Sequence, residues 1–268
     1  MMKRVFARGL EFGVVDQGQG TPVLLVHGFP LNHSMWNAQL PVLAAGRRVI
    51  APDLRGFGSS VDTEGTVSME DFADDLAAIL DDVQVREPIV YCGLSMGGYI
   101  GWQFLRKYRQ RVRGLVLCDT RSAADTREAA AGRLKMAEQV IADGMQPVAD
   151  GMLAKALSPR TMAERPEVVA AVRAMILSSD PTGVAAAQRG MAARPDVSDM
   201  LAGIDLPTLV MVGADDALSP ADEMRHIAEA IPHARFVVLP EAGHLSPLEN
   251  PREFNAALTE FLAGLDRQ

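Results

Sequence analysis

The fold is indicated most directly by the stretch Pro88-Ile-Val-Tyr-Cys-Gly-Leu-Ser95-Met-Gly-Gly-Tyr-Ile-Gly-Trp102. It begins with a short apolar run containing β-branched residues, which is typical of a buried strand, and continues past Ser95 with the apolar spacing of a helix. Glycines at 93 and 97 let the backbone reverse sharply at Ser95 and let the helix pack closely. Such a turn lifts the serine hydroxyl above the carboxyl edge of a sheet, beside the first N–H groups and the positive end of the helix. The stretch therefore predicts a nucleophilic serine. The simpler alternative is an ordinary strand–turn–helix with a solvated serine.

The composition limits the class of protein. The chain has 268 residues and 48% hydrophobic residues, which fits a single α/β unit with a large core. Its net charge of −8 argues against nucleic acid, which needs clustered Lys and Arg, and against anionic membranes. No apolar run reaches the roughly 20 residues of a membrane span, and the basic N-terminus lacks the apolar core of a signal peptide. Cys92 and Cys118 fall in expected strands and are interpreted as small core residues. We therefore expect a cytoplasmic protein that binds neither nucleic acid nor a membrane.

Strands and helices alternate along most of the chain, which predicts a mostly parallel eight-stranded sheet with helices on both faces. The alternation of residues 5–15 predicts an opening antiparallel hairpin. Six further strands are expected at 22–27, 48–51, 88–94, 112–118, 206–212 and 234–239. Helices are expected near 35–36, from the N-cap Ser68, after Ser95, at 220–230 and at 251–262.

The alternation stops between residues 122 and 199, where Ala, Met and charged residues recur with helical spacing. We expect this segment to form a helical lid inserted between two strands, with residues 1–121 and 200–268 forming the core. Half of the 14 methionines lie in or next to the lid, at 136, 145, 152, 162, 175, 191 and 200. They could line an adaptable apolar pocket, although helix packing is the simpler explanation for any one of them.

A serine nucleophile needs a base, and the base needs an orienting acid. Among five histidines, His244 is the best candidate base, because it follows the last strand in a loop at the same sheet edge as Ser95. His27 is interpreted as structural and His33 as a residue that could line the mouth of a site, whereas the histidines at 226 and 233 are expected at the surface. The acid is either Asp215 or Asp216, which follow another strand, and adjacent side chains diverge.

Five motifs, taken together, resemble the α/β-hydrolase superfamily. They are His27-Gly-Phe-Pro30, Asp53-Leu-Arg-Gly-Phe-Gly58, Gly93-Leu-Ser-Met-Gly-Gly98, Gly213-Ala-Asp-Asp216 and Ala242-Gly-His244. They occur in the family order Ser…Asp…His and cover essentially the whole chain. Within the superfamily, the sequence is most similar to small carboxylesterases and 3-oxoadipate enol-lactonase-like hydrolases.

The resemblance implies an α/β-hydrolase fold and a set of site residues. The family pattern Gly-x-x-Asp-x-x-x-Pro, matched here by Gly213 and Pro220, selects Asp216 as the acid. The catalytic residues would then be Ser95, Asp216 and His244. The backbone N–H groups of Phe29 and Met96 would form the oxyanion hole, and the 53–58 loop would be structural. The resemblance implies no cofactor and no metal.

The predicted function is hydrolysis of carboxylic esters, with short neutral acyl groups expected, by a serine carboxylesterase that forms an acyl-enzyme. The expected partners are a small-molecule ester and water, and the expected assembly is a monomer or homodimer. We place no basic cluster over Ser95 from the sequence, which favours neutral esters, although any of the basic lid residues Arg133, Lys135, Lys155 and Arg173 could turn inward. The alternatives are a lactonase such as 3-oxoadipate enol-lactone hydrolase, a perhydrolase side activity, and a non-catalytic ligand receptor on the same fold.

Overall fold

The computed structural model describes residues 2–61 and 63–267. Residues 1, 62 and 268, which belong to the segments assigned to the core, lie outside the described residues. The strands form one sheet in the order β1-β2-β4-β3-β5-β6-β7-β8, which confirms the predicted eight-stranded sheet. Their bounds are β1 Met2–Ala7, β2 Leu10–Gln17, β3 Pro22–Val26, β4 Arg48–Pro52, β5 Ile89–Leu94, β6 Val112–Cys118, β7 Thr208–Gly213 and β8 Arg235–Leu239.

The sheet is parallel except at one edge. β1 and β2 form the predicted antiparallel hairpin, and β2 also pairs antiparallel with β4, whereas all pairings from β4 to β8 are parallel. The strands β3, β5 and β7 are buried at every position, as continuous apolar runs predict for the centre of a covered parallel sheet. Cys92 and Cys118 are free and buried in β5 and β6, as expected. The carboxyl ends of the parallel strands therefore meet at one edge.

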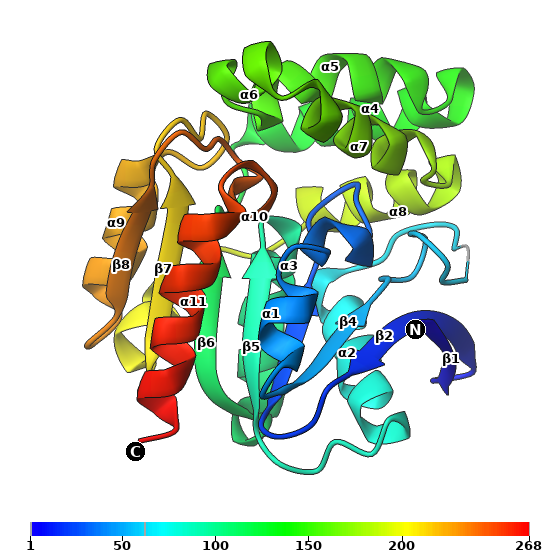
Figure 1. Ribbon diagram of the computed structural model, residues 1–268. Coiled ribbons are helices and arrows are strands. Elements are labelled where there is room, and N and C mark those ends of the chain that lie inside the picture. The colour runs from blue at the N-terminus through cyan, green and yellow to red at the C-terminus, as the bar shows by residue number, and fades with distance from the viewer. Residues whose placement is uncertain (1, 62, 268) are drawn as a thin grey trace.

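Helices cover both faces of the sheet: α1 Leu40–Ala44 and α11 Pro251–Leu265 lie in front of it in Figure 1, and α3 Met96–Tyr108 lies behind. The remaining core helices are η1 His33–Trp36, α2 Met69–Asp82, η2 Arg109–Arg111, α9 Ala221–Ala230 and α10 Ser246–Glu249. α2 begins where predicted, because the Ser68 side chain accepts the Asp71 N–H and the Asp71 carboxylate accepts the Ser68 N–H. A cap of this kind contributes about 1 kcal/mol. The short helices α1 and α10 are not among the sequence predictions.

Residues 122–199, which we propose as a lid, contain five α-helices and the first residues of η3 Ser198–Gly203. The five are α4 Arg127–Asp143, α5 Gln146–Ala156, α6 Pro159–Glu164, α7 Pro166–Leu177 and α8 Pro181–Ala192. They lie across the carboxyl edge of the sheet, at the top of Figure 1. α8 touches the core directly: a Cβ on Gly183 would lie 2.3 Å from the Gly56 carbonyl oxygen, so only glycine permits this approach.

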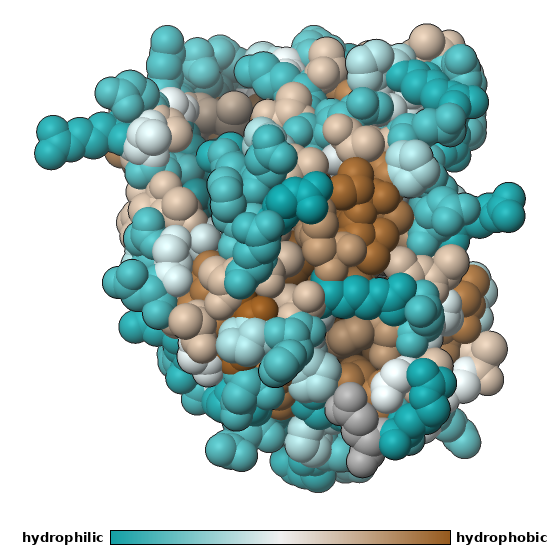
Figure 2. Space-filling view, turned by 90° about the vertical axis from the view of Figure 1, so that its left-hand side faces the viewer, coloured by the Kyte–Doolittle hydropathy of each residue, from teal (hydrophilic) through white to brown (hydrophobic). Residues whose placement is uncertain are grey.

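The edge strand β8 and the helix α9 lie on the left of Figure 1, and Figure 2 looks onto that side. The largest hydrophobic patch on this face lies to the right of its middle, with hydrophilic residues on its left and below it (Figure 2). Across residues 2–61 and 63–267, no single helix is long and apolar enough to cross a bilayer. The helices α7 and α8 reach that length and hydropathy only when they are counted together, and the chain bends by 93° between them.

Candidate active site

Ser95 stands at the turn between β5 and α3, as the sequence predicts. Its backbone has a positive φ of 53° with ψ −112°, a sparsely populated conformation that costs a non-glycine residue about 1–3 kcal/mol. The turn is held by the Ser95 N–H, which donates to the Cys118 carbonyl, and by the Thr120 hydroxyl, which donates to the Ser95 carbonyl at 2.8 Å. A Cβ on Gly97 would lie 2.4 Å from the Val26 carbonyl oxygen. The glycine therefore allows α3 to start directly against β3.

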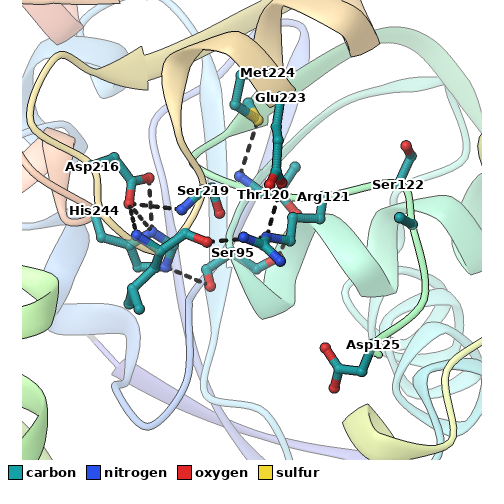
Figure 3. A network of polar contacts seen from close by, with 12 residues as sticks. Ser95, Thr120, Arg121, Ser122, Asp125, Asp216, Ser219, Glu223, Met224 and His244 are labelled. Carbon is teal, nitrogen blue, oxygen red and sulfur yellow. Dashed lines mark hydrogen bonds and ion pairs between the residues drawn. The ribbon is translucent and has the colours of Figure 1, made fainter. Parts of the chain in front are cut away.

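His244 and Asp216 meet Ser95 across the edge of the sheet (Figure 3). His244 Nε2 lies 2.8 Å from Ser95 Oγ, and His244 Nδ1 lies 2.9 Å from Asp216 Oδ2. The side chains of His244 and Asp216 are buried, whereas Ser95 is partly exposed. A carboxylate on Nδ1 keeps the proton there and leaves Nε2 free to accept one from the serine. The arrangement can therefore activate a serine hydroxyl.

The structure separates the two candidate acids. Asp216 Oδ1 accepts the N–H groups of Leu218 and Ser219 at 2.8 and 2.9 Å, which fixes its carboxylate against the His244 ring. Asp215 is exposed, its backbone N–H donates to the Ala242 carbonyl, and its carboxylate has no partner among the described residues. The loop thus presents one of the two adjacent carboxylates to the histidine and the other to solvent.

The rings of His27 and His33 have structural partners of their own. His27 is completely buried, and its Nε2 accepts the Leu54 N–H, so its Nδ1 carries the proton and donates to the Gly28 carbonyl. Burial lowers the pKa of His27 to about 4. The Asp53 carboxylate accepts both the backbone N–H and the ring Nδ1 of His33, which holds the 53–58 loop against η1. His226 and His233 are exposed.

A buried carboxyl group that sequence reasoning missed stands beside the acid. Asp119, at the end of β6, lies 2.5 Å from the Ser246 hydroxyl through Oδ2 and accepts the Gly213 N–H at 2.8 Å through Oδ1. Burial, and then the charge of Asp216, raise the pKa of Asp119 well above its usual range. Asp119 therefore connects the end of β7, which leads to Asp216, with the start of α10, which follows His244. Its only signal in the sequence was its place after a buried strand.

Phe29 and Met96, the expected oxyanion donors, lie on neighbouring segments: Phe29 is in the loop after β3, and Met96 is the first residue of α3. β3 pairs with β5 up to Val26 and Gly93, and an added Cβ on Gly28 would lie 3.5 Å from the Ser95 Cβ. Within the described part of the chain, the N–H groups of both residues have no hydrogen-bond partner. A role for them remains a proposal.

A cavity of about 570 Å³ opens above Ser95, between the sheet edge and the proposed lid. Its wall is mainly apolar and includes Phe29, Tyr99, Met136, Val148, Met152, Met191 and Leu218. Three lid methionines thus line the cavity, Met145 and Met175 are buried within the hydrophobic core, and Met162 is exposed. Some of these methionines therefore line a pocket and others pack between helices, so each of the two explanations applies to part of the set.

The cavity wall also carries three basic residues, contrary to the expectation of no basic cluster over Ser95. They are Arg121, Arg133 and Lys155. Arg121 pairs with Glu223 at 3.1 Å (Figure 3). Lys155 forms no ion pair within residues 2–61 and 63–267. The sequence does not show which face of α4 and α5 turns towards the sheet, which is why this cluster was missed.

Arg133 belongs to a charged trio, of which Arg133 and Asp125 line the cavity and Arg194 is buried behind them. Asp125 lies 2.5 Å from Arg133 Nε and 2.7 Å from Arg194, whose guanidinium stacks over the Tyr99 ring at 4.2 Å. Burial alone would raise the pKa of Asp125, but the two arginines outweigh it and lower this pKa. One carboxylate facing two arginines leaves the trio with one net positive charge. In the described residues, no group of three or more His, Cys, Asp or Glu side chains is arranged to hold a metal ion.

The sheet order and the helices inserted between β6 and β7 are those of the alpha/beta hydrolase fold. The model of the alpha/beta hydrolase fold family matches residues 21–251, so the chain belongs to that family.

Its relatives include esterases and lactonases. The structure of a thermophilic esterase from Thermogutta terrifontis, solved with malate bound, is 45% identical, with a TM-score of 0.96 and 99% of each chain covered. The enol-lactonase from Burkholderia xenovorans LB400 is 27% identical, with a TM-score of 0.91 over 97% of this chain and 100% of that chain. The 3-oxoadipate enol-lactonase 2 of Acinetobacter baylyi is 28% identical over 93% of this chain and 91% of its own length.

Proposed function

We propose that the protein is a serine hydrolase that cleaves carboxylic esters through an acyl-enzyme. The observation that carries the proposal is the continuous chain of contacts from Ser95 Oγ through the His244 ring to the Asp216 carboxylate. A partly exposed serine at the floor of a cavity, with a buried base and acid behind it, supports acyl transfer.

In the proposed reaction, Ser95 Oγ bonds to the ester carbonyl carbon while its proton passes to His244 Nε2. His244 then gives that proton to the departing alcohol, and the acyl group stays on Ser95. Water next loses a proton to His244 and bonds to the acyl carbon. The bond from that carbon to Ser95 Oγ then breaks, His244 returns its proton to Oγ, and the acid is released. Asp216 stabilises the imidazolium in both steps. The N–H groups of Phe29 and Met96 would stabilise the oxyanion by about 3 kcal/mol each.

The cavity supports a short or medium acyl group. Its apolar wall offers Met136, Met152 and Leu218 to the hydrocarbon part of a substrate. Its volume of about 570 Å³ falls in the ordinary range of small-molecule sites. Neutral, short acyl esters remain our first candidate substrates.

A second candidate is an ester or lactone that also carries a carboxylate. The observation that favours it is the set of basic residues at the cavity wall, where Lys155 supplies a positive charge and Arg133 shares Asp125 with the buried Arg194. The relatives named above include two enol-lactonases and an esterase solved with malate, a dicarboxylate. The machinery at Ser95 would be the same for either substrate.

The test is hydrolysis of p-nitrophenyl acetate, butyrate and octanoate, with 3-oxoadipate enol-lactone alongside, by the wild type and by Ser95→Ala. We expect turnover of the short esters that Ser95→Ala abolishes. Rapid opening of the lactone with feeble ester turnover would favour the second candidate. Turnover of these substrates that survives in Ser95→Ala would contradict the proposal.

A further inference from the structure

Glu249, at the end of α10, is a buried carboxylate that the proposed reaction does not use. One of its oxygens, Oε1, accepts the N–H of Gly243 at 2.9 Å and that of Leu245 at 3.2 Å. These are the two residues on either side of His244. No Lys or Arg forms an ion pair with Glu249 within the described part of the chain, so backbone N–H groups are the donors that stabilise this carboxylate.

The second oxygen of Glu249 reaches the proposed lid. Oε2 accepts the N–H of Ser158 at 2.7 Å, at the residue that caps α6. The same junction is joined to the base directly, since the His244 N–H donates to the Ala156 carbonyl at 2.9 Å. The backbones are pressed together here, because a Cβ on Gly243 would lie 2.7 Å from the Ser158 nitrogen. One side chain thus holds both neighbours of His244 and fastens them to the segment between α5 and α6.

We propose that Glu249 is a positioning residue for His244, and that it makes the 243–245 segment and the 156–158 junction of the lid one mechanical unit. The inference rests on the proposed function, in which His244 must point at Ser95. The imidazole direction follows from the backbone at residue 244, and the Glu249 carboxylate fixes that backbone from both sides. Movement of the α5–α6 junction would therefore move the base.

The variant that tests the proposal is Glu249→Gln. A carboxamide has one acceptor oxygen, so its NH₂ group would face at least one of the three N–H donors. We expect kcat on p-nitrophenyl butyrate to fall about 10- to 100-fold, since a displacement of about 1 Å can lower a rate about 100-fold. KM should change by less than about threefold, because substrate binding is not what the substitution disturbs. Glu249→Asp, which keeps both oxygens, should recover part of kcat.

A matched control is Asp16→Asn at the opposite edge of the sheet. Asp16 is a buried carboxylate that pairs with Arg48 at 2.9 Å, at the amino end of β4. Its substitution should lower the melting temperature but leave kcat within about twofold, as expected for a change that touches neither base nor cavity. If Glu249→Gln likewise loses stability and keeps its kcat, Glu249 is only structural and the proposal is wrong.

Amide hydrogen exchange of the wild type tests the same proposal without any variant or substrate. If the carboxylate joins the two segments, the amides of Gly243, Leu245 and Ser158 should open together with one common free energy. Exchange of Ser158 independently of the other two would overturn the proposal. This result does not depend on whether Ser95 proves to be the nucleophile, so the two proposals can fail separately.

Discussion

Asp216 directs both carboxylate oxygens at His244 Nδ1, at distances of 2.9 and 3.1 Å. The acid is held for this task by its own loop, through the N–H groups two and three residues further on. Its neighbour Asp215 points to solvent. Two adjacent, chemically identical side chains are thus given different environments, and only one of them can orient the base.

Asp216→Asn should lower kcat by about 10,000-fold, because a carboxamide no longer favours the tautomer with the proton on Nδ1. Asp215→Asn is the matched control and should leave kcat within about twofold. Steady-state kinetics of both variants on p-nitrophenyl butyrate measure the difference. Equal losses in the two variants would contradict the assignment of the acid.

His27 should make the protein sensitive to acid. Its pKa is about 4 in the folded state against 6.5 without burial, so the unfolded chain takes up the proton first. Stability from this group is complete above pH 6.5 and is lost as the pH falls from there towards 4, by about 3 kcal/mol in all. Denaturant unfolding of the wild type and His27→Gln at several pH values measures this contribution. The difference in free energy of unfolding between the wild type and His27→Gln should narrow as the pH falls. A difference that does not change with pH would contradict this prediction.

The effect of Asp119 on the pH dependence of stability should be opposite to that of His27. Its pKa is raised on folding, so the folded state keeps the proton longer than the unfolded chain does. Its contribution to stability is therefore present at low pH and is lost as the pH rises above 3.8. Asn resembles the protonated acid, so Asp119→Asn should gain stability relative to the wild type as the pH rises. Unfolding curves of the pair across pH 4 to 9 test the sign, and a relative loss at high pH would refute it.

Lys155 should matter for anionic substrates only. Lys155→Met keeps an apolar stem and removes the charge from the cavity wall. An exposed charge pair is worth about 0.2–1 kcal/mol, so kcat/KM for mono-p-nitrophenyl succinate should fall about two- to fivefold. The kcat/KM for p-nitrophenyl butyrate should not change. The control is Lys135→Met, which removes an exposed charge on α4 and should leave kcat/KM for both esters unchanged. Equal changes on both esters would remove the argument for a carboxylate-bearing substrate.

The fold was predictable because its signals are local. A continuous apolar strand, a glycine-flanked serine and a helix with a capping serine each lie within about fifteen residues. The parallel order then brings Ser95, Asp216 and His244 to one edge, because each follows the carboxyl end of a strand. The choice between Asp215 and Asp216 came from the resemblance, because the residues alone left both open and only the family pattern from Gly213 to Pro220 selects Asp216.

The contacts that the sequence did not reveal join residues far apart in the chain. Glu249 meets Ser158 across 91 positions, and Asp119 meets Ser246 across 127. Each pair depends on how the 122–199 segment or a strand end sits on its neighbour, and no periodicity encodes that. The inward turn of Arg133 and Lys155 was missed for the same reason, since α4 and α5 carry polar residues on several faces.

Trapping the acyl-enzyme tests the central claim most directly. The wild type would be mixed with p-nitrophenyl butyrate, quenched in acid within the first turnovers and mapped by peptide mass spectrometry. A serine mechanism predicts a butyryl group on the peptide that contains Ser95, and no such group in Ser95→Ala. A butyryl group on another residue would contradict the serine mechanism. So would turnover without any acylated peptide in the wild type, in Ser95→Ala and in the slowed Asp216→Asn variant.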